Sequence, residues 1–222
     1  MNFIPANESR FFTWFFERYT EWSLKRRFKQ IWVKQDYAPA SDSKTVYFLN
    51  HNMWWDGLIP LYLNRHFFRQ NARALMEDKQ MWQYSFFSKI GAFSINLDDP
   101  RSALRSLRYA VESMHREHSC LFIYPEGIIT PASEKKPEFK QGLAWIYQQL
   151  GSDVDFVPVG IYAHFIRSSK PELHMAIGNS VDHDKSLSRN ELTDLFERDI
   201  HHVLTDLRNK SGFSDKEFEP QF

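Results

Sequence analysis

The fold is decided by the stretch TVYFLNHNMWWD, residues 45–56. Its first five residues form a largely apolar run, which is typical of a strand buried on both faces. His51 and Asp56 follow where this strand ends, and α/β proteins bind their ligands at such strand ends. A histidine takes up a proton near neutral pH, and a carboxylate bonded to its other ring nitrogen fixes the tautomer and stabilises the cation. The pair predicts a base that activates a substrate hydroxyl, although the same spacing also arises by chance around histidines that only pack.

Strand-like and helix-like segments alternate on either side of this stretch. Asp99-Pro100 is an N-cap followed by a first-turn proline, and Ser188 with Glu191 forms a capping box. The alternation predicts an α/β fold with a mostly parallel or mixed central sheet flanked by helices. The expected strands are 45–49, 72–76, 92–97, 120–124, 156–162 and 172–177, and the expected helices are 56–70, 78–88, 99–118, 138–150 and one opened by Ser188.

The aromatic content is the unusual feature of the composition. The 222 residues fit one domain with at most a small appendage, yet they include 20 Phe, 7 Trp and 9 Tyr, more than such a core needs. We therefore expect some rings to face something other than protein. The single cysteine, Cys120, excludes an internal disulfide and favours a reducing compartment. Because neither a secretory signal nor a run of about 18 apolar residues is visible, we expect a soluble or membrane-surface protein.

Basic and aromatic residues are concentrated in residues 10–34. Seven Lys or Arg residues stand there against Glu17 and Glu21, a net charge of +5, whereas the whole chain is neutral. Large rings and cations in one helical segment are typical of a helix at the lipid headgroup boundary. The commoner alternative is an amphipathic helix that packs on its own domain. The residues expected to contact a membrane are Phe11, Phe12, Trp14, Phe15, Trp22, Arg26, Arg27 and Lys29.

The same pattern divides the chain into three parts. Residues 1–40 are predicted to be the membrane-interface helix and a linker, 41–212 the main domain, and 213–222 a loose tail. Within the main domain, Tyr124-Pro125-Glu126-Gly127 ends a second buried strand. Taken alone, these four residues predict only an ordinary turn with a solvated glutamate. Because strand ends converge at one edge of an α/β sheet, we expect Glu126 to lie close to His51.

Four blocks together resemble the signature of the glycerolipid acyltransferases. They occur in family order within residues 45–165, and they are most like those of the bacterial lysophosphatidic acid (1-acylglycerol-3-phosphate) acyltransferases. The blocks are Asn50-His51-x4-Asp56, Gly91-Ala92-Phe93-Ser94-Ile95, Tyr124-Pro125-Glu126-Gly127 and Val157-Pro158-Val159.

The resemblance implies transfer of a fatty acyl group from acyl-CoA or acyl carrier protein to a lipid hydroxyl. His51 is then the general base, and Asp56 orients it and stabilises its cation. No acyl-enzyme, no metal and no cofactor beyond the acyl thioester are implied, and the enzyme is expected at the cytoplasmic face of the cell membrane. The strand 157–159 is expected to line the acyl groove. The expected substrate-binding residues are Trp54, Trp55, Lys79, Pro125, Glu126 and Gly127.

Two positions depart from the family pattern. Leu97 stands where the second block usually closes with an arginine, and Ile128-Ile129 follow Gly127 where the third block usually continues Thr-Arg. In relatives these arginines are thought to grip the acceptor phosphate, since a guanidinium binds phosphate oxygens in pairs. Either other cations supply the charge, or the acceptor lacks phosphate, as in a glycosylated carotenoid or isoprenoid or a lyso-aminolipid. The candidate cations are Lys79, Arg101, Arg105 and Lys135.

Two other functions stay open at this point. A catalytically inactive lipid-binding protein is favoured by the missing arginines and opposed by the intact His51-Asp56 pair. A thioester hydrolase would use the same base on water. Nucleic acid is not an expected partner, because the chain outside the basic N-terminal segment is acidic.

Overall fold

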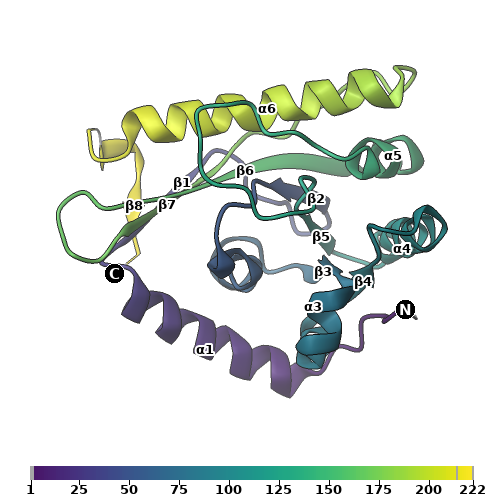
Figure 1. The fold of residues 1–222 in the computed structure, drawn as a ribbon, viewed down its shortest axis with the longest axis horizontal. Coiled ribbons are helices and arrows are strands. Elements are labelled where there is room, and N and C mark those ends of the chain that lie inside the picture. The colour runs from purple at the N-terminus through teal and green to yellow at the C-terminus, as the bar shows by residue number, and fades with distance from the viewer. Residues whose placement is uncertain (1–2, 214, 222) are drawn as a thin grey trace.

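The computed structural model describes residues 3–213 and 215–221. Within them, eight strands form one mixed sheet in the order β4-β3-β5-β2-β6-β7-β1-β8 (Figure 1). This confirms the predicted α/β fold. The strands are β1 Ile31–Gln35, β2 Lys44–Leu49, β3 Asn71–Glu77, β4 Ala92–Ile95, β5 Ser119–Ile123, β6 Val154–His164, β7 Glu172–Ile177 and β8 Glu219–Pro220. The α-helices are α1 Arg10–Arg27, α2 Ile59–Leu63, α3 Asp78–Gln83, α4 Pro100–Ser113, α5 Gly142–Gln149 and α6 Arg189–Lys210.

The predicted strand at 45–49 is the centre of the parallel part of the sheet. β2 pairs in parallel with β5 on one side and with β6 on the other, so that Thr45 lies between Cys120 and Asp155. All residues from Thr45 to Leu49 are buried, because helices cover both faces of the sheet at this strand. β3 and β4 extend the parallel region, whereas β6 pairs with β7 in antiparallel fashion.

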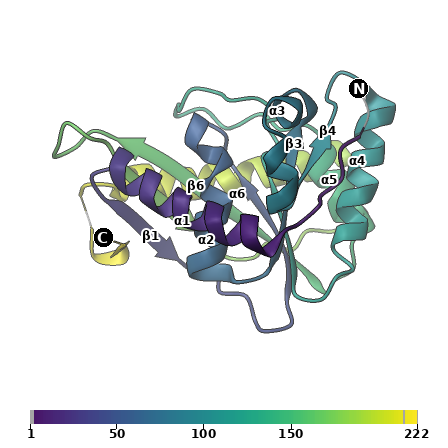
Figure 2. The same ribbon diagram turned by 90° about the horizontal axis from the view of Figure 1, so that it is seen from below.

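The helices lie in two layers, one on each face of the sheet. Helices α1 and α2 pack on one face, and α4, α5 and α6 pack on the other (Figures 1 and 2). Each layer encloses its own apolar cluster, with Tyr47 and Phe122 in the first and Phe48 and Phe196 in the second. The neighbouring residues Tyr47 and Phe48 thus point to opposite faces, as the strand period requires.

Several aromatic side chains of helix α1 are exposed, whereas Phe12 and Phe16 are partly buried. Phe11, Trp14 and Trp22 are 67%, 55% and 55% exposed. The buried residues of the helix are Thr20, Ser23 and Leu24, so its inner face is partly polar. A helix that only packs on its own domain has the opposite arrangement, with apolar residues inside and polar residues outside.

The predicted helical region 10–34 is shorter than expected. α1 ends at Arg27, and β1 begins at Ile31 and pairs in parallel with β7. Ile31 and Val33 are buried while Trp32 between them is only partly buried, which is the two-residue period of a strand. The wealth of rings and cations in this segment conceals that period in the sequence.

The predicted helix 56–70 is broken into three pieces. A 3-10 turn at Trp54–Gly57 is followed by α2 and by a π-helical turn, Asn64–Phe68. The Asn64 side chain closes this π turn, because its amide donates to the carbonyl of Gln70 and its oxygen accepts from the Gln70 N–H, both at 3.0 Å. Arg69 takes the left-handed conformation, φ 55°, that the reversal requires.

The C-terminal segment 213–222 is not a loose tail where it is described. Phe218 is buried against Ala176 and Leu207, and β8 pairs in antiparallel fashion with β1. Residues 214 and 222 of the predicted tail lie outside the described residues. No helix in the described part of the chain is long and apolar enough to cross a membrane.

Candidate active site

His51 and Asp56 form a hydrogen-bonded pair directly after β2. Oδ2 of Asp56 accepts hydrogen bonds from Nδ1 of His51 at 2.8 Å and from the backbone N–H groups of Asn52 and Met53 at 2.7 and 2.9 Å. The 3-10 turn Trp54–Gly57 brings the carboxylate back to the strand end, and Asp56 is fully buried. Because Nδ1 is engaged, Nε2 of His51 is the nitrogen that can take a proton from a substrate.

Glu126 holds the backbone on which His51 is mounted. Its Oε1 accepts from the His51 backbone N–H at 2.7 Å, and its Oε2 accepts from the hydroxyl of Thr130. The backbone N–H of Thr130 in turn donates to the His51 carbonyl at 2.8 Å. Burial raises the pKa of Glu126, and the charge of Asp56 adds to the rise. The predicted proximity of Glu126 to His51 is thus present, with contact through the main chain.

Tyr124 and the two asparagines beside His51 complete the frame. The Tyr124 hydroxyl donates to the Asp56 carbonyl at 2.6 Å, and its ring centre lies 4.7 Å from that of His51. Burial, reinforced by the charge of Asp56, raises the pKa of Tyr124, so this hydroxyl remains a donor. The side-chain amides of Asn50 and Asn52 both donate to the Ile161 carbonyl at 2.9 Å, which ties the motif to β6. The sequence does not predict these hydrogen bonds. Tyr124 and Asn50 are part of the quoted motifs, but nothing in the sequence assigns them a role.

The side chain of His51 lines a cavity of about 760 Å³. Its walls are mostly apolar and come from α1, β3, β4, β5, α4, α5 and the 3-10 turn Ser85–Ile90. Phe16 of α1 stacks on Phe86 at 4.5 Å between ring centres, which closes the side of the cavity that faces α1. A volume of this size is typical of sites for small organic ligands.

The predicted substrate-binding residues divide into two groups. Pro125, Gly127 and Trp54 line the cavity, whereas Glu126, Trp55 and Lys79 do not. Trp55 packs against Phe28 in the core, and its ring also contacts that of Trp54 edge to face, with 5.2 Å between the ring centres. Lys79 bonds to Asp98 at 2.9 Å and has a second ion pair to Glu77. Of these two partners, Glu77 lines the cavity and Asp98 does not.

The strand 157–159 does not line the cavity as predicted, because Val157 and Val159 are fully buried in the core under α1 and α2. The cavity is not lined by Arg101, Arg105 or Lys135, the other cations predicted as possible contacts of an acceptor phosphate. Among the described residues, the Lys and Arg side chains that do line it are Arg73 of β3 and Lys140. Lys140 comes from the loop after β5, a placement that sequence spacing does not indicate.

Lys140 lies across Gly127 at the mouth of the site. A Cβ atom at Gly127 would come within 2.8 Å of Lys140 Cε and 3.1 Å of Leu97 Cδ1, so a larger residue there would displace the end of the Lys140 side chain. Gly127 also has φ 72°, which favours glycine independently. The two departures from the family pattern, Leu97 and Ile128, line the same cavity. Lys140 thus brings a cation to the region where the family arginines are missing.

The residues predicted to contact a membrane lie on or next to α1. Phe11, Trp14, Phe15, Trp22, Arg26, Arg27 and Lys29 are exposed, and the guanidinium of Arg26 lies 4.9 Å from the Trp22 ring centre. Phe12 is partly buried beneath Lys89, whose ammonium lies 4.3 Å from the ring centre. Phe15 also lines the cavity. Over the residues that the structure describes, no group of three or more His, Cys, Asp or Glu side chains is placed to hold a metal ion.

Two comparisons with known proteins found a match, one with a family model and one with a solved structure. A family model described as "Acyltransferase" matches residues 30–162, which include β1, His51, Asp56 and Glu126. No match was found among the curated proteins. Among solved structures, the fold is similar to the crystal structure of the 1-acyl-sn-glycerophosphate (LPA) acyltransferase PlsC from Thermotoga maritima, with 20% identity, a TM-score of 0.63, and coverage of 88% of this chain and 80% of that one. Since the family model spans more than half of the chain and contains the His51-Asp56 pair, the chain belongs to the acyltransferase family.

Proposed function

We propose that the protein transfers a fatty acyl group from a thioester, acyl-CoA or acyl carrier protein, to a hydroxyl of a lipid acceptor such as 1-acylglycerol-3-phosphate. The proposal rests on one observation: His51, whose Nδ1 is bonded to buried Asp56, lines a mostly apolar cavity of about 760 Å³. A base alone would suit many hydrolases and transferases. A base beside room for an alkyl chain suits chemistry on a fatty acyl group.

The steps of the reaction follow from the pair. Nε2 of His51 takes the proton as the acceptor oxygen attacks the thioester carbonyl, and Asp56 stabilises the imidazolium that forms. The tetrahedral intermediate then collapses, the C–S bond breaks, and the proton on His51 passes to the leaving thiolate. An ester and a thiol result, and no other reactant is consumed.

The cavity supplies binding energy for the acyl chain. Each methylene that leaves water for the apolar lining contributes about 0.8 kcal/mol. Leu75, Ile95 and Leu107 belong to this lining, and each comes from a different element. Such binding holds the thioester carbonyl beside His51, which lowers the entropic part of the barrier.

The acceptor side of the site favours two classes of lipid. Lys140 supplies a cation for a phosphate, which supports a lysophospholipid. Ile128 and Ile129, 62% and 53% exposed, are apolar where relatives carry a phosphate-binding arginine, which supports a second candidate, a phosphate-free acceptor such as a glycosylated carotenoid or a lyso-aminolipid.

A peripheral position on the cytoplasmic face of the membrane is part of the proposal. The outward aromatic face of α1 and the exposed cations Arg26 and Lys29 suit an anionic lipid surface. Phe15 is exposed and also lines the cavity, so α1 connects that surface with the site. An acyl chain or acceptor would then reach His51 without crossing water.

One assay tests the transfer and separates it from the alternatives. Thiol release from hexadecanoyl-CoA and hexadecanoyl acyl carrier protein is followed without acceptor and with 1-acylglycerol-3-phosphate, a lyso-aminolipid or a glycosylated carotenoid. We expect release only when a hydroxyl acceptor is present, and its absence in His51→Ala. Equal release without acceptor would instead identify a hydrolase. No release under any condition would leave the lipid-binding alternative.

Membrane contact is tested separately by sedimentation with anionic vesicles. We expect Trp14→Ser with Trp22→Ser to weaken binding, because two exposed indoles are lost from α1. The matched control is Trp82→Ser, since Trp82 is 57% exposed on α3 instead. Loss of binding in the control but not in the α1 variant would overturn this part of the proposal.

A further inference from the structure

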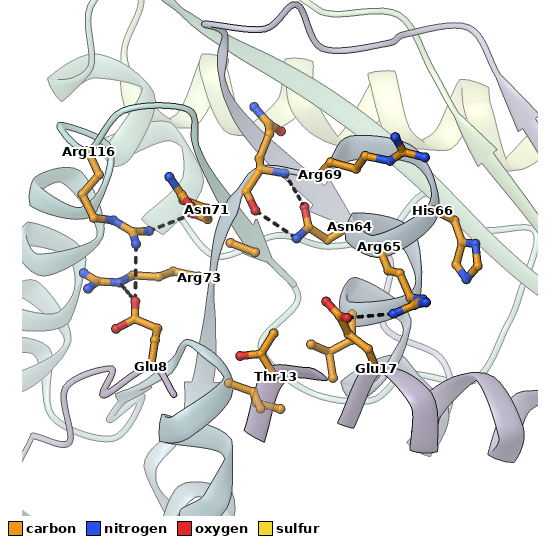
Figure 3. A pocket seen from close by; sticks show the side chains of 14 residues that line it. Glu8, Thr13, Glu17, Asn64, Arg65, His66, Arg69, Asn71, Arg73 and Arg116 are labelled. Atoms are coloured by element: carbon orange, nitrogen blue, oxygen red, sulfur yellow. Dashed lines mark hydrogen bonds and ion pairs between the residues drawn. The ribbon is translucent and has the colours of Figure 1, made fainter. Parts of the chain in front are cut away.

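A second cavity, of about 950 Å³, lies at the edge of the sheet where β3 begins, whereas His51 stands at the edge where the parallel strands end. Its lining is rich in charge (Figure 3). The lining arginines are Arg65, Arg69, Arg73 and Arg116, and the lining carboxylates are Glu8 and Glu17. Four cations against two anions give the lining a net charge of +2.

One side of the cavity holds two arginines on a single carboxylate. Oε1 of Glu8 lies 2.6 Å from Nε of Arg73 and 3.4 Å from a terminal nitrogen of Arg116. Burial lowers the pKa of Arg116, and the neighbouring positive charge of Arg73 lowers it further. The cluster therefore carries one unmatched positive charge, and an additional anion there would relieve the repulsion.

The other side is a rigid turn that presents further cations. The π turn Asn64–Phe68 carries Arg65, which pairs with Glu17 of α1 across 2.9 Å (Figure 3). Arg69 follows in the left-handed conformation and has no ion-pair partner among residues 3–213 and 215–221. Short π turns and left-handed non-glycine residues are uncommon, and they occur often at functional sites. Here the two together place Arg69 in the lining of the cavity.

We propose that this cavity is a binding site for a phosphate monoester, separate from the site at His51. A phosphate monoester carries about −1.5 to −2 charges near neutral pH, which matches the excess on the lining. Guanidinium groups bind phosphate oxygens in pairs, and arginines are available on both sides of the cavity. The binding chemistry does not depend on the proposed acyl transfer.

The wall that the two cavities share identifies the source of the phosphate. Leu61, Ala72, Arg73 and Ile90 line both the cationic and the apolar cavity. A single-chain lipid phosphate fits this arrangement, with its phosphate on the arginines and its alkyl chain toward the apolar lining. Thr13 and Glu17 of α1 line the cationic cavity, so such a lipid would enter beside the helix proposed to rest on the membrane.

The test compares three probes on the full chain by isothermal titration: dodecyl phosphate, inorganic phosphate and the neutral dodecyl maltoside. We expect dodecyl phosphate to bind more tightly than inorganic phosphate. Arg69→Gln and Arg116→Gln should each weaken its binding about tenfold, the effect of losing one charge-assisted pair. Glu8→Gln should tighten it, because the lining loses a negative charge. The control Arg198→Gln, at an exposed site on α6, should change nothing.

Each other result has a defined meaning. Equal binding and equal mutational response of inorganic and dodecyl phosphate would retain the phosphate site but overturn the lipid source. Binding of the maltoside as tight as that of dodecyl phosphate, or no response to Arg69→Gln and Arg116→Gln, would overturn the site. His51→Ala must still bind dodecyl phosphate; loss there would place the phosphate at the catalytic edge. Urea unfolding of each variant without ligand identifies any variant that is misfolded. Because the Arg69 side chain is exposed, Arg69→Gln is the substitution with the smallest expected effect on folding.

Discussion

Replacing Asp56 by asparagine gives a sharp test of the His51-Asp56 pair, because the structure predicts how the amide will sit. Oδ2 receives two backbone N–H groups, from Asn52 and Met53, in addition to Nδ1 of His51. Three donors converge on one position, so the carbonyl oxygen of the asparagine must occupy it. The amide NH₂ then takes the place of Oδ1, which is buried and has no hydrogen-bond partner among the described residues.

Two magnitudes follow from this orientation. The tautomer of His51 is preserved, so activity loses only the charge that stabilises the imidazolium. A hydrogen bond to a charged partner is worth about 1.5–3 kcal/mol, and a pair of charges about 4 Å apart is worth about 4 kcal/mol at an effective dielectric constant of 20. The turnover number should therefore fall about 10- to 1,000-fold. The buried NH₂ should cost about 1–3 kcal/mol of unfolding free energy.

The assay is thiol release with a saturating acceptor, combined with urea unfolding. His51→Ala is the second single variant of a double-mutant cycle with Asp56→Asn. Because Asp56 acts only through His51, Asp56→Asn should have no further effect on turnover in the His51→Ala background. Turnover within about threefold of the parent, or losses that multiply in the double variant, would refute the assigned relationship between the two residues.

Three further changes test other parts of the site. Because burial raises the pKa of Glu126, the folded chain retains a proton there that the unfolded chain releases, so the contribution of Glu126 to stability is greatest below the ordinary value of 4.5 and is lost as pH rises through the raised pKa. Glu126→Gln should remove this fall in urea unfolding across a pH series, and an unchanged slope would contradict the assignment. The larger side chain of Ala74→Phe should occupy part of the cavity and lower kcat/KM about fourfold for each acyl methylene that no longer fits. The loss should be larger with a hexadecanoyl than with an octanoyl thioester. The control Ala38→Phe, at an exposed position, should have no effect. Lys140→Met should raise the KM for a phosphate-bearing acceptor about tenfold and leave the KM for a phosphate-free acceptor unchanged. The control is Lys79→Met, because Lys79 does not line the cavity and pairs with Asp98. Equal effects of the two substitutions would exclude Lys140 as the phosphate contact.

The parts of the site that could be predicted lie at strand ends. His51, Asp56 and Glu126 follow β2 and β5, which are adjacent parallel strands, so the pattern of buried runs was enough to bring the three together. Local chemistry also placed the beginnings of α4 and α6, since the side chains of Asp99 and Ser188 both cap their helices. These features depend on contacts that are short in sequence or on strand order.

The parts that could not be predicted depend on distant contacts. Trp55 is predicted to bind substrate because a broad flat ring suits a sugar or a large apolar acceptor, but it packs against Phe28. Lys140 reaches the mouth only because Gly127 leaves room for its side chain. The π turn is set by the side-chain bonds between Asn64 and Gln70. None of these three contacts can be predicted from the spacing of residue types along the chain.

The short strand β8 has a consequence for handling the protein. Glu219 and Pro220 pair with β1, and the N–H of Gln221 donates to the Ile31 carbonyl at 3.0 Å, so this short segment covers the outer edge of β1 from Ile31 to Val33. An uncovered edge strand with large apolar side chains is a template for pairing with another chain. A recombinant version trimmed before Phe218 would bare this edge and lose the ring that packs against Ala176 and Leu207. Such a version should form concentration-dependent oligomers or aggregates in size-exclusion chromatography even while its distant catalytic edge remains intact.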